Sequence, residues 1–213
     1  MRGKFITLEG GEGSGKSTLL AELASRLEVA GKTVVRTREP GGTALAESIR
    51  ALVLHPPENQ TWSPMAEALL MNTARTDHLE KLIRPALSRG EWVLCDRFAD
   101  STRVYQSVNG GVADDVLKLM ETLVVGETRP DLTIILDAPV DATAERRRSR
   151  AGPADAFELR DKKFHEQVRL AFVTIARSEP ERCILLDASQ PAARVADAAW
   201  AAVTKRLSLE ARV

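Results

Sequence analysis

The residues best suited to chemistry lie near the start of the chain, where glycines, a lysine and a serine stand close together. Residues 10–17 read Gly-Gly-Glu-Gly-Ser-Gly-Lys-Ser, which fits the pattern GxxxxGK[ST]. In such a loop backbone N–H groups surround phosphate oxygens, the lysine reaches the β- and γ-phosphates, and the serine hydroxyl ligates Mg²⁺. The motif therefore predicts a nucleoside triphosphate site made of Gly10, Gly11, Glu12, Gly13, Ser14, Gly15, Lys16, Ser17 and Thr18. The alternative is a glycine-rich turn before a surface helix, and no GxGxxG dinucleotide pattern is present.

Two further clusters place charged residues directly after apolar runs. Asp96 and Arg97 follow Trp-Val-Leu-Cys, where a carboxylate can hold a metal-bound water and a guanidinium can bind a phosphate with two hydrogen bonds. Arg38 opens the segment Arg-Glu-Pro-Gly-Gly-Thr, whose turn would bring backbone and arginine close to an anion. A salt-bridged strand end and an ordinary loop are the structural alternatives.

A third cluster of cations lies in the second half of the chain. Arg146, Arg147, Arg148 and Arg150 precede the irregular stretch 150–155, and this arrangement suits a lid that closes over phosphates and excludes water. A solvated helix face is the alternative. The chain contains no Asn-Lys-x-Asp guanine-binding motif and no Asp-x-x-Gly switch motif, which disfavours a regulatory GTPase.

Short apolar runs alternate with longer helical patterns, as in βαβ units with a mostly parallel sheet. The runs predict strands at Phe5–Glu9, Thr33–Arg38, Trp92–Asp96, Leu132–Asp137 and Cys183–Asp187. Helices are expected from the phosphate loop to Gly31, and over Ala44–Leu54, Pro64–Arg89 with a bend at Pro85, Ser101–Asn109, Ala113–Val125, Asp141–Arg150, Phe157–Arg177 and Pro191–Leu209. Ligands bind beyond the carboxyl ends of such strands, so the charged strand ends should converge on one site.

The composition describes an ordinary globular protein and excludes several classes. The 213 residues include 30 Lys and Arg and 30 Asp and Glu, so the formal net charge is zero. The chain therefore has no excess of positive charge that would favour binding to nucleic acid or to an anionic membrane. No membrane-spanning run, signal peptide, linker or repeat is evident, so we expect a single cytoplasmic domain over residues 1–213. Cys95 and Cys183 are interpreted as buried thiols in strands, and the three histidines receive no role.

Taken together, these motifs resemble the bacterial thymidylate kinase family. The resemblance rests on Thr-Arg-Glu-Pro-Gly-Gly-Thr at 37–43, on the phosphate loop with Glu12 inside it, and on Asp96-Arg97-Phe98 followed by Ser101-Thr102 and Tyr105-Gln106. It covers the chain from Phe5 to the last helix. It implies a three-layer P-loop NTPase fold, with about five parallel strands between helices and a lid near 146–157. It also implies transfer of the ATP γ-phosphoryl group to dTMP with Mg²⁺, in a homodimer.

The resemblance also implies roles for individual residues. Lys16 and Arg97 act on the transferred phosphoryl group, Ser17 and Asp96 lie at Mg²⁺, and Arg146 approaches ATP. Glu12 meets the sugar 3′-hydroxyl, Arg38 and Arg97 clamp the acceptor phosphate, and Tyr105 excludes a 2′-hydroxyl. Arg75 binds a thymine carbonyl, with Thr102 and Gln106 near the base or sugar. The substrate-binding set is Glu12, Arg38, Glu39, Pro40, Met71, Arg75, Arg97, Ser101, Thr102, Tyr105 and Gln106.

Two positions depart from the family pattern. Met71 stands where the family has a phenylalanine that stacks on thymine, so base discrimination is weakened or an aromatic residue elsewhere compensates. Ala156 stands where the family has a lid arginine, and we expect Arg148 or Arg150 to replace its charge. Two competing functions remain. One is a kinase for another nucleoside monophosphate or a deoxynucleoside, and the other is a regulatory ATP-binding protein that transfers no phosphate.

Overall fold

The computed structural model describes residues 2–57, 60–108, 111–148 and 155–209. Within these ranges five strands form one sheet in the order β2-β3-β1-β4-β5, and every neighbouring pair is parallel. The strands are β1 (Phe5–Gly10), β2 (Val34–Arg38), β3 (Trp92–Asp96), β4 (Leu132–Asp137) and β5 (Cys183–Asp187). The predicted α/β fold is confirmed, and its strand ends share one edge of the sheet.

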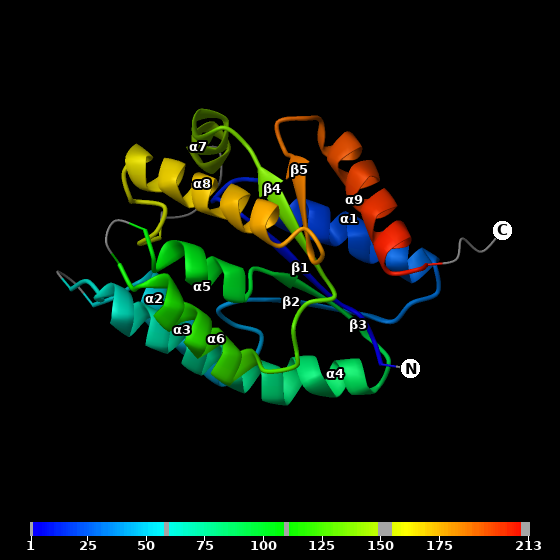
Figure 1. The fold of residues 1–213 in the computed structure, drawn as a ribbon, viewed down its shortest axis with the longest axis horizontal. Helices are drawn as coiled ribbons and strands as arrows, with labels where there is room; N and C mark the ends of the chain where they lie inside the picture. Colours follow the sequence, from blue (N-terminus) through cyan, green and yellow to red (C-terminus); the bar gives the residue numbers. More distant parts are fainter. Residues whose placement is uncertain (1, 58–59, 109–110, 149–154, 210–213) are drawn as a thin grey trace.

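Helices cover both faces of the sheet (Figure 1). They are α1 (Lys16–Val29), α2 (Ala44–Leu54), α3 (Pro64–His78), α4 (Arg84–Ser88), α5 (Ala99–Tyr105), α6 (Asp114–Val125), α7 (Val140–Arg148), α8 (Lys162–Ser178) and α9 (Ala192–Arg206), with a π-helical turn at Leu79–Ile83. Helices α1 and α9 pack on one face, α4, α5 and α8 pack on the other, and α2, α3 and α6 pack together beside α5. None of the described helices is both long and apolar enough to cross a membrane.

The two faces of the sheet bury separate groups of apolar side chains. Leu23 and Leu27 of α1 pack against Ile134, and all three are fully buried. On the other face Val168 and Phe172 of α8 pack against Ile135. Because a parallel sheet is covered on both sides, its central strands read as continuous apolar runs, which is why they were recognisable in the sequence.

Local chemistry explains where some helices depart from the predicted bounds. The expected bend near Pro85 is the π-helical turn Leu79–Ile83, which widens the helix just before a proline that donates no hydrogen bond. The helix predicted from Phe157 begins only at Lys162, because Asp161 accepts a hydrogen bond from Phe164 N at 2.7 Å and caps that end.

Other helix ends also differ from the predictions. Helix α5 spans Ala99–Tyr105 rather than starting at Ser101. Helix α9 ends at Arg206, before the predicted Leu209. The predicted helix ends at Asn109 and Arg150 lie outside the described residues.

Candidate active site

The phosphate loop lies between β1 and α1, at the edge of the sheet where the strands end. Gly10 has φ 131°, and a Cβ there would lie 2.5 Å from Leu136 O, so the turn requires glycine. Lys16 is buried, and its Nζ donates to Gly10 O at 3.1 Å and to Gly11 O at 2.9 Å. Burial, aided by the positive charge of Arg97, lowers the pKa of Lys16 from 10.5 to about 8.

Ser17 and Asp96 come together although they are far apart in the sequence. Ser17 Oγ donates to Asp96 Oδ2 at 2.9 Å, and Asp96 ends β3 directly beside β1. Mg²⁺ in nucleotide sites uses one or two protein oxygens and completes its shell with water and phosphate. The two oxygen-bearing side chains fit that requirement.

Arg97 connects the phosphate loop to the α5 segment. It has φ 69°, a left-handed conformation that is uncommon for a residue with a side chain. Its guanidinium donates to Gly10 O at 3.0 Å, to Glu12 Oε1 at 2.6 Å and to Tyr105 OH at 3.2 Å. These contacts hold a partly buried cation beside the phosphate loop.

A cavity beside Arg97 brings most of the predicted substrate-binding residues together. It is lined by Glu12, Glu39, Pro40, Arg50, Leu54, Met71, Arg75, Arg97, Phe98, Ser101, Thr102, Tyr105, Gln106, Asp155 and Phe157. Every residue of the predicted substrate-binding set is there except Arg38. We call this space the α5 cavity.

A second cavity opens over the phosphate loop and includes Arg38. It is lined by Glu12, Gly13, Gly15, Lys16, Ser17, Arg38, Glu39, Arg50, Asp96, Arg97, Asp155 and Glu158. We call it the loop cavity. Five residues line both cavities, namely Glu12, Glu39, Arg50, Arg97 and Asp155, so the two spaces meet at two guanidinium groups and three carboxylates.

Arg38 and Arg50 reach this junction from neighbouring elements. The Arg38 side chain is 55% exposed and pairs with Glu47 at 3.0 Å. Arg50 donates to Pro40 O at 3.0 Å, and burial, with the charge of Arg38, lowers its pKa. Arg50 was not among the predicted site residues, although it lies three residues after Glu47 on the helix that follows the Arg-Glu-Pro-Gly-Gly-Thr segment.

Arg75 lines the α5 cavity but not the loop cavity, and it is 2% exposed. Its Nε donates to Glu39 at 2.8 Å, NH1 to Asn72 at 3.1 Å and NH2 to Thr102 at 2.9 Å. The other oxygen of Glu39 lies 3.0 Å from His78 Nδ1. His78, which the sequence analysis left without a role, thus supports the residues around Arg75 from behind.

Met71 and Phe157 both line the α5 cavity. Phe157 lies edge-on to Tyr105, with ring centroids 5.5 Å apart and an interplanar angle of 87°. An aromatic side chain from the segment before α8 therefore reaches the cavity that Met71 lines. The sequence analysis placed Phe157 in a helix and did not connect it with the site.

The lid arginines are described in part. Both terminal nitrogens of Arg146 lie 3.3 Å from Ala188 O, beyond the end of β5. Arg146 also lines a third cavity, with Thr18, Gly15 and Gln190. Arg148 is exposed at the end of α7, and Arg150 lies outside the described residues.

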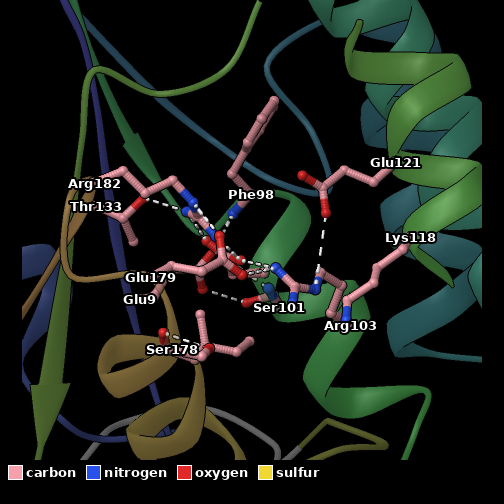
Figure 2. Close-up of polar contacts among 12 residues, drawn as sticks. Glu9, Phe98, Ser101, Arg103, Lys118, Glu121, Thr133, Ser178, Glu179 and Arg182 are labelled. Carbon is pink, nitrogen blue, oxygen red and sulfur yellow. Dashed lines mark hydrogen bonds and ion pairs between the residues drawn. The ribbon is translucent and has the colours of Figure 1, made fainter. Parts of the chain in front are cut away.

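Glu9 is a buried carboxylate under the site that the sequence analysis noted only as a strand end. Figure 2 shows it between β1 and the start of α5, where it accepts from Phe98 N at 2.8 Å and from Ser101 Oγ at 2.6 Å. Ser101 Oγ in turn accepts from Arg97 at 3.1 Å. Burial, with the nearby charge of Asp100, raises the pKa of Glu9 from 4.5 to about 7.

Behind Glu9 a group of buried charges joins α5 to the start of β5 (Figure 2). Arg182 donates to both oxygens of Asp100 at 2.7 Å and to Thr133 at 3.0 Å. Arg103 pairs with Glu179 at 2.8 Å. These contacts fix the helix that carries Ser101, Thr102 and Tyr105, and no local sequence pattern indicates them.

Comparisons with known proteins agree on one family. The family model described as thymidylate kinase matches residues 8–199. A thymidylate kinase from Bradyrhizobium sp. (strain ORS 278) is 50% identical over 208 residues, which are 97% of this chain and 92% of that protein. One from Caulobacter vibrioides (strain ATCC 19089 / CIP 103742 / CB 15) is 47% identical over 208 residues, 98% of this chain and 99% of that protein. The crystal structure of thymidylate kinase from Ehrlichia chaffeensis has a TM-score of 0.76 and 33% identity, covering 95% of this chain and 99% of that one.

Proposed function

The chain belongs to the thymidylate kinase family and transfers the γ-phosphoryl group of ATP to dTMP, giving dTDP and ADP, and we propose how its cavities divide this work. The observation that carries the proposal is the junction of the loop cavity and the α5 cavity at Arg97, Arg50 and Glu12. Two phosphate-bearing substrates in these cavities would meet there end to end.

ATP occupies the phosphate loop in this proposal. Backbone N–H groups of residues 10–18 and the N-terminus of α1 bind its phosphates, and Lys16 turns from Gly10 O and Gly11 O to the β- and γ-phosphates. The third cavity, with Thr18 and Arg146, extends away from the junction and is suited to the nucleoside part of ATP.

Ser17 Oγ would hold Mg²⁺, and the Asp96 carboxylate would bond to water on the ion. When bound, the ion neutralises charge on the β- and γ-phosphates. Asp96 also fixes the Ser17 hydroxyl through their hydrogen bond. This assignment needs only the two side chains and the triphosphate itself.

The acceptor dTMP occupies the α5 cavity. Arg75 and Gln106, which line the α5 cavity but not the loop cavity, would contact the base, and Thr102, which bonds to Arg75, would lie near the base or sugar. Tyr105 and Glu12 would contact the sugar, with the Tyr105 ring excluding a 2′-hydroxyl. Arg97, Arg50 and Arg38 bind the acceptor phosphate, which requires Arg38 to exchange Glu47 for the phosphate.

Positioning and charge neutralisation then dominate the reaction. The acceptor phosphate is itself the nucleophile, so the protein supplies no strong base. Lys16 and Arg97, which both donate to Gly10 O, would bind the equatorial oxygens of the γ-phosphoryl group. An arginine of segment 146–157 would add a further positive charge as the lid. Residues 1–213 act as one domain in this scheme.

An ADP-release assay across dTMP, dUMP, dCMP, AMP and thymidine tests the function. We expect dTMP to have the highest kcat/KM. Preference for another acceptor would assign the α5 cavity to that nucleotide. Tight ATP binding without any transfer would instead support a regulatory protein, although two acceptor-side arginines, Arg38 and Arg97, have no use in an ATP sensor.

We also propose a homodimer formed through α3 and α6, which pack side by side. Met65 and Leu69 lie four residues apart on α3, and Leu119 and Leu123 do so on α6; all four are exposed. Such stripes favour burial against a second copy. Sedimentation equilibrium should give twice the mass of 23.3 kDa.

A cytoplasmic location is supported by the free thiols of Cys95 and Cys183.

A further inference from the structure

The side-chain amide of Gln106 is held in one orientation at the wall of the α5 cavity. Gln106 is 1% exposed, and its Nε2 donates to Glu67 Oε2 at 3.1 Å. Its Oε1 is buried and accepts no hydrogen bond from any residue in the described parts of the chain. A buried acceptor that the protein itself leaves unused, in the wall of a ligand cavity, indicates a donor on the ligand.

Glu67 determines which end of this amide is available. It belongs to the first turn of α3 and is 7% exposed, and among the described residues it is not part of the cavity wall. An ionised carboxylate only accepts hydrogen bonds, so it attracts the NH₂ end of Gln106 and repels the oxygen. Turning the amide over would place two oxygens in contact inside the protein, which is unfavourable there.

Arg75 supplies the opposite chemistry beside Gln106. Each of its three nitrogens donates one hydrogen bond, to Glu39, Asn72 and Thr102 respectively. A guanidinium has more N–H groups than these contacts use, and it never accepts. The base end of the cavity therefore offers a donor from Arg75 next to an acceptor from Gln106.

We propose that Glu67 is a positioning residue for base specificity, which fixes the Gln106 amide so that the site binds 4-oxopyrimidines and rejects the 4-aminopyrimidine of dCMP. Thymine and uracil present an acceptor at O4 and a donor at N3, which complement Arg75 and Gln106. Cytosine presents a donor at the 4-position and an acceptor at N3, so both contacts would oppose like groups. The inference rests on the proposed placement of the base in the α5 cavity.

The substitution Glu67→Gln tests this role with almost no change of shape. A glutamine at this position can donate as well as accept, so the Gln106 amide becomes free to turn its NH₂ toward N3 of cytosine. We expect the ratio of kcat/KM for dTMP to that for dCMP to fall by about tenfold or more. The ratio for dTMP to dUMP should stay unchanged, because these two bases share the same hydrogen-bonding edge.

A matched control separates amide orientation from the ion pair that Glu67 also makes. Arg160 NH2 lies 3.4 Å from Glu67 Oε1, while Gln106 uses Oε2. Arg160→Gln should therefore leave the dTMP:dCMP ratio unchanged. Because burial raises the pKa of Glu67, all variants are compared at pH 8.

A double-mutant comparison shows whether Glu67 acts through Gln106. In the Gln106→Met background, where no amide is present, adding Glu67→Gln should leave the dTMP:dCMP ratio as it is. If Glu67→Gln does not fold, as judged by circular dichroism, Glu67→Met also removes the acceptor and should lower the ratio in the same way.

The results distinguish this inference from the proposed function. One outcome is that the wild type phosphorylates dTMP while Glu67→Gln lowers kcat/KM for dTMP and for dCMP by the same factor. In that case Glu67 is only structural and the inference is wrong. The same holds if Arg160→Gln lowers the ratio as much, or if the effect persists without Gln106. If the wild type does not phosphorylate dTMP at all, the proposed function itself fails.

Discussion

Replacing Glu9 with glutamine should change how the stability of the protein depends on pH. The Glu9 carboxyl group is fully buried at the end of β1 and has a pKa of about 7, compared with its ordinary 4.5. The folded protein thus binds the proton more tightly than the unfolded chain does. Protonation of Glu9 stabilises the fold fully below about pH 4.5, and this contribution is lost as the pH rises through 7.

The size of the effect follows from the two pKa values. Between pH 5 and pH 8 the wild type should lose roughly 2 to 3 kcal/mol of unfolding free energy through this one group. Glutamine is neutral throughout and can still accept from Phe98 N, so Glu9→Gln keeps most of the geometry without this titration. Any cost of altered hydrogen bonds should be nearly independent of pH.

Urea unfolding followed by tryptophan fluorescence at several pH values between 5 and 8 measures this difference. The free energy of unfolding of Glu9→Gln minus that of the wild type should rise by roughly 2 to 3 kcal/mol between pH 5 and pH 8. Glu28→Gln, which changes an exposed carboxylate paired with Arg36, is the control and should show no comparable slope. A flat or falling difference for Glu9→Gln would mean that burial does not govern this carboxyl group.

The remaining predictions concern catalysis. Lys16→Ala should abolish phosphoryl transfer while circular dichroism and the melting temperature stay close to wild type; normal turnover would contradict the mechanism. In the wild type, KM for ATP should rise above about pH 8, because Lys16, with its pKa of about 8, loses its charge there. Met71→Ala should weaken the dTMP:dUMP preference, and a preference as sharp as that of phenylalanine-bearing relatives, kept in the variant, would exclude a role for Met71. Arg148→Ala or Arg150→Ala should lower kcat by about tenfold or more, and unchanged turnover in both would refute the lid assignment.

The sheet and the phosphate loop were predictable because their signals are local. Each central strand is one apolar run, and the glycines, Lys16 and Ser17 lie within a single short motif. The family resemblance, which the comparisons confirm, also brought most of the α5 cavity into the prediction. The roles of the individual site residues stay predictions until they are tested.

The features that were missed depend on partners far apart in the sequence. Helix α5 begins at Ala99 because a carboxylate from another element, Glu9, accepts from Phe98 N, and no cap lies in the local sequence. Glu67 on α3 and Gln106 directly after α5 are likewise 39 residues apart. The spacing of residues along the sequence describes one helix or strand at a time, so it does not indicate pairs between distant elements.

Glu9 and Gly10 are consecutive residues, yet in the proposed arrangement they serve different substrates. Glu9 anchors the helix that carries the proposed dTMP contacts, and Gly10 opens the loop proposed to hold the ATP phosphates. Arg97 bonds to Gly10 O and through Ser101 to Glu9. In the proposed arrangement, the ATP-binding loop and the helix at the dTMP cavity are therefore tied to adjacent residues of one strand, so a movement of donor relative to acceptor would come from other parts of the chain.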